Sequence, residues 1–253
     1  SFPAPPDAVD TRVIVPYFRK LRFYMSDLFG SSAAATDYDA NQIEVLEGLE
    51  PVRHRPGMYI GGTDERAFHH LAAEILDNSM DEAVAGHANW IEVNLEAANT
   101  LSVKDNGRGI PTDPHPKFPD KSALEVIMTT LHAGGKFSGK AYQTSGGLHG
   151  VGASVVNALS ERLWVEVKRD GNIHRQEYKI GDPTTKLEKT GTAKKTGTKV
   201  CFFPDGTIFK TTTFEYSIIA ERLRELAYLN SGLEIQLKDE RTEEGESDTF
   251  KFS

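Results

Sequence analysis

The segment FHHLAAEILDNSMDEA places acidic, amide and imidazole side chains at helical spacing. His70, Glu74 and Asn78 follow one another four residues apart, so on a helix they share one face. Asp81 and Glu82 lie close to the same line, and apolar residues flank it, which indicates a face turned toward a cleft. There a glutamate can act as a general base, a histidine can orient it, and an asparagine oxygen can bind Mg²⁺. Taken alone, such a charge run is more typical of a solvated helix face.

A second set of candidate residues lies in SVKDNGRGIP, where a predicted strand runs into a glycine-rich turn. Asp105 ends the strand, and Gly107, Gly109 and Pro111 follow it closely. A carboxylate held at such an edge can accept a hydrogen bond from a ligand amine. DNG is also a common turn sequence, so this cluster by itself is more typical of a simple connection.

A third candidate is the glycine-rich loop SGGLHGVGA at residues 145–153, directly before a predicted helix. Backbone amides in such a loop can hold phosphate. It is not a dinucleotide fingerprint, because Gly147, Gly150 and Gly152 give G-x-x-G-x-G and no strand precedes them. The upstream GGKFSGKA is not a Walker loop, because Ala141 stands where a magnesium-binding Ser or Thr is required. The segment is either a lid that closes over a nucleotide or a surface omega loop.

The elements that position these clusters follow from hydrophobic periodicity. The sequence predicts helices over residues 65–85, 122–131, 152–159 and 214–230, and strands over 91–96, 100–105, 163–169, 173–180, 198–204 and 233–240. The two-residue turn Asp170-Gly171 between two of the strands indicates an antiparallel hairpin. We therefore predict an α+β fold in which helices cover one face of a mixed or mostly antiparallel sheet.

Composition restricts the class of protein. The 253 residues fit one large domain, and a formal net charge of -8 argues against this chain alone gripping a nucleic-acid backbone. The one cysteine, Cys201, excludes an internal disulfide, is compatible with a reducing cytoplasm and is expected to be a small core residue. No run approaches the roughly 18 apolar residues of a membrane span. The proline-rich, then basic and linker-like segment 1–36 is expected to be a flexible extension of a domain at 37–253.

Together the clusters give the order E-x-x-x-N, D-x-G-x-G, G-x-x-G-x-G, which resembles the GHKL (Bergerat-type) ATPases. The strings VLEGLEPVRHRPGMYIG, ILDNSMDEAVAGHA, DNGRGIPTD, LHAGGKFSGKAYQTSGGLHGVGASVVNALS and TGTKVCFFP resemble the ATPase domain of bacterial type IIA topoisomerase B-type subunits. These subunits are gyrase B and the ParE subunit of topoisomerase IV, and LEPVR and FHHLAAEILDNSMDEA favour ParE. The resemblance covers the chain from about Tyr38 onward and implies the two-layer GHKL sandwich, with helices on one face of a mixed, mostly antiparallel sheet.

The resemblance also implies roles for single residues. Glu74 would be the general base that activates water for attack on the γ-phosphate of ATP, with His70 as its partner. Asn78 would bind Mg²⁺, Asp105 would take the adenine amino group, and Thr198 would support the adenine through hydrogen bonds. The other implied nucleotide-binding residues are Tyr38 and Ile43 of an N-terminal arm, Glu82 with its partner Arg108, Gly109, Ile110 and Pro111 at the adenine pocket, Lys136 and Tyr142 of the lid, Gly147, Leu148, His149, Gly150, Val151 and Gly152 around the phosphates, and Arg169 at the pocket mouth.

For the whole subunit, the resemblance implies an ATP-driven gate for DNA strand passage in the cytoplasm. The subunit would form a homodimer through its N-terminal arm, pair with an A-type subunit, and meet DNA through the full enzyme only. We expect the transducer, Toprim and DNA-cleavage domains to be absent from this chain and its ATP hydrolysis to be weak, because a transducer lysine completes the family site. The alternatives are a non-hydrolysing, ATP-dependent dimerisation sensor and a histidine-kinase core; Glu74 and GGLHGVG favour water as the phosphoryl acceptor.

Overall fold

A mixed β-sheet forms one layer of the fold in the computed structural model, which describes residues 45–133, 150–242 and 245–252. Within these ranges the sheet has nine strands. Their order is β11 (Glu246–Lys251), β10 (Glu234–Asp239), β1 (Trp90–Glu96), β2 (Thr100–Asp105), β9 (Gly197–Pro204), β5 (Ser160–Arg169), β6 (Asn172–Lys179) and β7 (Asp182–Pro183), with β8 (Glu188–Thr192) paired to β6. β1 and β10 are parallel and the other neighbours are antiparallel, which confirms the predicted sheet type.

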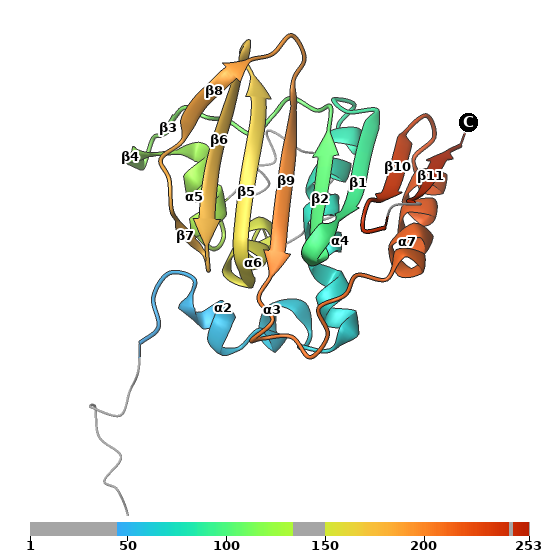
Figure 1. The fold of residues 1–253 in the computed structure, drawn as a ribbon. Coiled ribbons are helices and arrows are strands. Elements are labelled where there is room, and N and C mark those ends of the chain that lie inside the picture. Colours follow the sequence, from blue (N-terminus) through green and yellow to red (C-terminus); the bar gives the residue numbers. More distant parts are fainter. Residues whose placement is uncertain (1–44, 134–149, 243–244, 253) are drawn as a thin grey trace, which may run out of the picture. The chain divides into compact units, whose positions relative to one another are not determined.

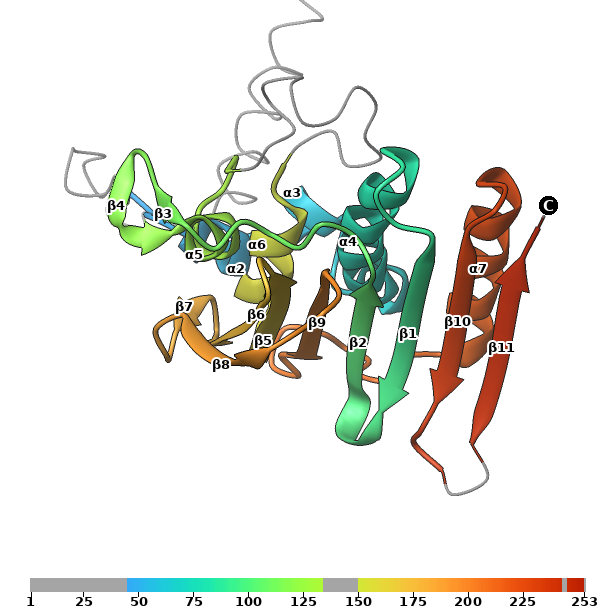
Figure 2. The same ribbon diagram turned by 90° about the horizontal axis from the view of Figure 1, so that it is seen from above.

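Helices form the second layer, on one face of this sheet (Figures 1 and 2). They are α4 (Glu65–Val84), α5 (Ala123–Thr129), α6 (Gly152–Ala158) and α7 (Tyr216–Leu229). The other elements are α2 (Glu50–His54), α3 (Gly57–Ile60), the 3-10 turn η2 (Ala97–Asn99) and a hairpin of β3 (Pro114–His115) and β4 (Phe118–Ser122). The predicted two-layer α+β fold is confirmed. In the described ranges, no helix has the length and apolar character needed to cross a membrane.

Helix α4 positions the site and is held by its apolar face. Phe68, Leu71 and Ile75 recur every three or four residues and are buried in the core against the sheet. Full burial of each such side chain contributes roughly 1.5–3 kcal/mol. The helix begins after Asp64, whose carboxylate accepts a hydrogen bond from the backbone N–H of Ala67 at 3.0 Å. With one face fixed in the core, the polar face of α4 has a defined direction.

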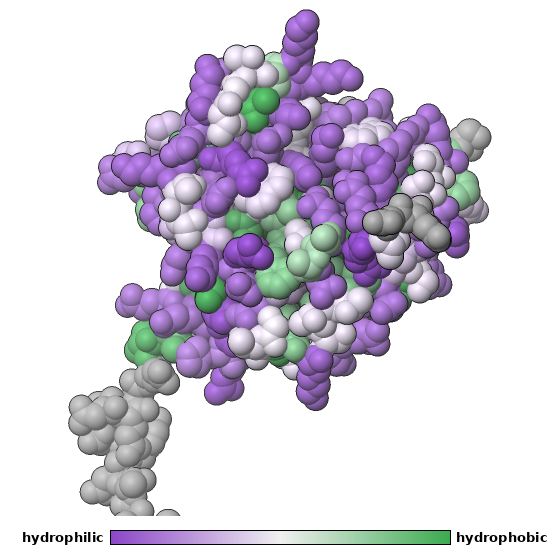
Figure 3. Space-filling model, viewed as in Figure 1, coloured by the Kyte–Doolittle hydropathy of each residue, from purple (hydrophilic) through white to green (hydrophobic). Residues whose placement is uncertain are grey.

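The opposite face of the sheet is mainly hydrophilic (Figure 3). Both tryptophans of the chain lie there, with Lys104 Nζ 5.1 Å from the centre of the Trp90 ring and the Arg175 guanidinium 4.1 Å from that of Trp164. Cys201 is a small buried core residue, as predicted, and strand alternation turns its side chain toward Glu96 on this face of the sheet. Burial, reinforced by Glu96, raises the pKa of the Cys201 thiol to about 12.

Candidate functional site

The polar face of α4 carries a histidine–carboxylate pair. His70 Nε2 lies 3.2 Å from Glu74 Oε1, one helical turn away, and the two side chains are 44% and 23% exposed. The hydrogen bond to Glu74 raises the pKa of His70 above its ordinary value, although partial burial opposes the shift. The imidazole therefore fixes the orientation of the Glu74 carboxylate and supplies a proton that the pair can share.

The Glu74 carboxylate lies against the start of α6. A Cβ atom at Gly152, the first residue of α6, would collide with Glu74 Oε2, so a larger residue here would displace the Glu74 carboxylate. The preceding Val151 packs against the core, and Gly150 has a positive φ of 60°. The end of the predicted phosphate loop and the candidate base, 78 residues apart in sequence (152 - 74), are thus neighbours in space.

Asp105, at the end of β2, has a buried carboxylate that accepts fewer hydrogen bonds from the described residues than it could. Its Oδ1 accepts from the backbone N–H groups of Gly107 at 2.8 Å and Thr198 at 3.3 Å. Its Oδ2 accepts from the Ser79 hydroxyl on α4 at 3.0 Å. Burial raises the pKa of Asp105, and these hydrogen bonds oppose the shift. A carboxylate accepts about four hydrogen bonds, so beside these donors from the described residues one position stays open to a ligand.

The turn after Asp105 is clamped to α4. The Arg108 backbone N–H donates to Glu82 Oε2 at 2.8 Å, and the Arg108 guanidinium donates to Glu82 Oε1 at 2.7 Å. The implied pairing of Glu82 with Arg108 is therefore present in the structure. The clamp sets the path of the chain between α4 and the sheet.

The far side of the same turn is fixed by β5 and β9. Arg169 donates from Nη1 to the Gly109 carbonyl at 2.8 Å, and the Ile110 N–H donates to Thr198 Oγ1 at 3.4 Å. Gly109 has a φ of 79°, and a Cβ there would press on the Lys168 carbonyl, so glycine is required on two grounds. The turn that follows Asp105 is thereby held in one conformation.

The described candidate residues fall into two groups joined by α4. The first group is His70, Glu74 and Gly152, and the second is Glu82, Asp105, Arg108, Gly109, Ile110, Arg169 and Thr198. Asn78 lies on α4 one turn after Glu74, Pro111 follows the second group, and Gly150 and Val151 precede the start of α6. Tyr38, Ile43, Lys136, Tyr142, Gly147, Leu148 and His149 lie outside the described residues.

Sequence reasoning missed Ser79, the residue that joins α4 to Asp105. Its buried hydroxyl was detectable only as a small polar residue beside Asn78, and no spacing rule assigns it a partner on a strand. The described residues contain no cluster of three or more His, Cys, Asp and Glu side chains that could hold a metal ion. A hard cation here would draw on amide oxygen and on the oxygens of a ligand.

These contacts, on the helix-covered face of a mixed sheet, are consistent with the class of ATPases that the sequence resembles. Residues 63–208 match the family model "Histidine kinase-, DNA gyrase B-, and HSP90-like ATPase", and the chain belongs to this family. Within the family, the resemblance to the ATPase domain of type IIA topoisomerase B-type subunits is confirmed by curated relatives.

The B subunit of DNA topoisomerase 4 from Caulobacter vibrioides is 63% identical over 207 residues, which cover 81% of this chain and 30% of the relative. The B subunit of DNA gyrase from Halalkalibacterium halodurans is 59% identical over 216 residues, and that from Haloferax volcanii is 57% identical over 220 residues; each match covers 85% of this chain and 34% of the relative. The chain therefore spans about a third of the length of these relatives.

Proposed function

We propose that this chain binds ATP between α4 and the turn after β2, and hydrolyses it with Glu74 as the general base. The observation that supports this most strongly is the open acceptor position of buried Asp105, which contacts Ser79 on α4, the helix that carries the His70–Glu74 pair. Ser79, which contacts Asp105, lies five residues after Glu74 on α4. Five residues at 1.5 Å each separate them by about 7.5 Å along the helix axis. This axial separation is within the span of one elongated ligand.

Asp105 would select adenine. The exocyclic amine of adenine donates hydrogen bonds, whereas guanine has an acceptor oxygen at the same place. The open acceptor position of the ionised Asp105 carboxylate can accept a hydrogen bond from the adenine amine. The same carboxylate would repel the oxygen of guanine. Thr198, which donates its N–H to Asp105 and accepts from Ile110, would hold this acceptor in place.

Glu74 would activate the attacking water at the other end of the ligand. Its carboxylate would accept a proton from water, while His70 keeps it oriented through the 3.2 Å contact. Phosphoryl transfer depends mainly on positioning and charge neutralisation. Backbone N–H groups at the start of α6, next to Glu74, would supply hydrogen bonds to phosphate. Asn78, on the same face of α4, is suited to hold Mg²⁺, which when bound would neutralise phosphate charge.

In the complete subunit we assign this activity to an ATP-driven gate for DNA strand passage. This assignment is supported by relatives named as the B subunits of gyrase and topoisomerase 4. In this proposal the ATPase domain comprises residues 37–253 and follows an extension at 1–36. The subunit forms a homodimer in which Tyr38 and Ile43 reach the partner's nucleotide, and Lys136 and Tyr142 supply lid contacts. The subunit also pairs with an A-type subunit and is located in the cytoplasm.

Thermal unfolding with nucleotides tests the proposed binding. ATP with Mg²⁺ at 100 times its Kd would stabilise the folded chain by about 2.7 kcal/mol and raise the Tm, because it binds only the folded state. GTP at the same concentration would leave the Tm close to that of the free protein. The absence of a shift with ATP, or equal shifts with both nucleotides, would contradict the proposal.

A further inference from the structure

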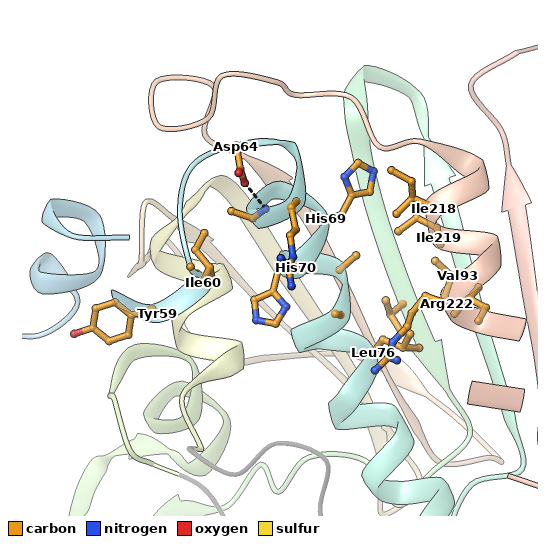
Figure 4. A pocket seen from close by; sticks show the side chains of 17 residues that line it. Tyr59, Ile60, Asp64, His69, His70, Leu76, Val93, Ile218, Ile219 and Arg222 are labelled. Carbon is orange, nitrogen blue, oxygen red and sulfur yellow. Dashed lines mark hydrogen bonds between the residues drawn. The ribbon is translucent and has the colours of Figure 1, made fainter. Parts of the chain in front are cut away.

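A cavity lies between α4 and α7, with the sheet as its floor (Figure 4). Its volume is about 610 Å³, within the range of small-molecule sites. Val93 and Val103 form the floor, Leu76 comes from α4, and Ile219 and Leu223 come from α7. All five side chains are apolar, so the interior suits a hydrocarbon or aryl group.

The lining of this cavity includes two positively charged side chains. Arg66 on α4 and Arg222 on α7 both line it and are exposed. Arg66 forms no ion pair with any residue in the described ranges. Arg222 pairs with Glu225 at 3.4 Å, but these side chains are 48% and 57% exposed, so solvent competes strongly with the pair. Among the described residues that line the cavity, the one acidic group is Asp64, which already accepts the N-cap hydrogen bond of α4.

We propose that this cavity binds an amphipathic monocarboxylate, such as a medium-chain fatty acid. The apolar chain would occupy the cleft between α4 and α7, and the carboxylate would pair with Arg66 and Arg222. Guanidinium groups present two parallel N–H donors that match a carboxylate, which favours this head group over a neutral or cationic one.

The cavity is also connected to the candidate active site. His69 and His70 are consecutive on α4 and both line it. His69 Nδ1 is 2.8 Å from the Glu65 carbonyl, and its Nε2 accepts from the Glu215 N–H at 2.9 Å, which ties the start of α7 to α4. His70 makes the contact to Glu74. An anion at the opening would favour the imidazolium form of His70, strengthen its hydrogen bond to Glu74, and weaken Glu74 as a base. Bound carboxylate would therefore inhibit hydrolysis, an effect that rests on the proposed function.

Isothermal titration calorimetry with decanoate below its micelle concentration tests the site. We expect saturable one-to-one binding to the wild type, with decanol and decylamine at least tenfold weaker. Arg222→Ala would weaken decanoate binding about tenfold, whereas the matched control Arg222→Lys, which keeps the charge, would stay within threefold. Ala73→Phe, which fills the cavity from α4, would abolish binding. Unfolding curves establish that each variant is folded.

The inference is overturned if the wild type shows no saturable binding, or if folded Ala73→Phe binds decanoate as the wild type does. Should Ala73→Phe fail to fold, equal affinity of Arg222→Ala and Arg222→Lys would overturn it instead. Phosphate release then tests the inhibition: decanoate should slow the wild type and leave a folded Ala73→Phe unaffected. Release that does not depend on Glu74 in the absence of decanoate would refute the proposed function alone, because binding is measured without ATP.

Discussion

Replacing Gly152 by alanine tests whether the Glu74 carboxylate must lie against the start of α6. The added methyl group would overlap Glu74 Oε2, so the carboxylate must move away from its place beside His70. A displacement of about 1 Å at a reacting group can lower the rate about 10²-fold. A positioned general base contributes roughly 10²–10⁴-fold. We therefore expect Gly152→Ala to reduce phosphate release by at least about 10²-fold.

The substitution has a second measurable consequence, which is a change in the titration of His70. Loss of the contact to Glu74 would bring the pKa of His70 back down toward its ordinary value, since that hydrogen bond is what raises it most. The His70 ring signals in an NMR titration report this change.

Gly191→Ala is the matched control. A Cβ at Gly191 would meet only the Ile173 side chain, at an ordinary contact distance of 3.5 Å. We expect this variant to release phosphate at the wild-type rate. If Gly152→Ala also releases phosphate within twofold of the wild type, with an unchanged His70 titration, the placement of Glu74 against α6 has no catalytic importance.

Three further outcomes follow from the site and the sheet. The Asp105→Asn variant should be as stable as the wild type, because an amide oxygen can still accept the hydrogen bonds from Gly107 and Thr198. Its affinity for ATP, measured by calorimetry, should fall at least about tenfold, since the asparagine NH₂ group would face the adenine amine. The contact with Glu74 raises the pKa of His70 in the folded state. The contribution of this pair to the free energy of unfolding is therefore full below the ordinary pKa of 6.5 and is lost as pH rises through the folded-state pKa. In urea unfolding, His70→Ala should accordingly lose more stability relative to the wild type at acidic pH than at alkaline pH. Cys201, with a pKa of about 12, should resist thiol reagents at pH 8 until the protein unfolds, and rapid labelling of the native protein would contradict its burial.

The local elements were predictable where periodicity is strong. Helix α4 matches the predicted 65–85 closely, and β1 and β2 appear where alternation indicated them. The predicted helix at 122–131 ends earlier, at Thr129, because Thr130 is extended. The short helices α2 and α3 were missed, because a four- or five-residue helix carries no periodic signal. Strand β11 was also missed, since its ESDTFK sequence is largely polar.

In the site, too, the sequence predicts contacts within one helix but not contacts between elements. The spacing of His70 and Glu74 on one helix predicts their contact directly. The contacts of Gly152 with Glu74 and of Ser79 with Asp105 depend on how α6 and β2 pack against α4. Such contacts follow from tertiary packing, which no spacing within a single element encodes. The resemblance to a known family grouped Glu74, Asp105 and Gly152 in one site, whereas it gave no role to Ser79.

The central claim is that Glu74 is the base for ATP hydrolysis, and single-turnover phosphate release tests it most directly. Wild type and Glu74→Gln would be saturated with Mg-ATP, with nucleotide occupancy measured independently in both. Glutamine keeps the size of the side chain but cannot accept the proton, so we expect full occupancy and release slowed by at least about 10²-fold. Equal release rates at equal occupancy would contradict the claim.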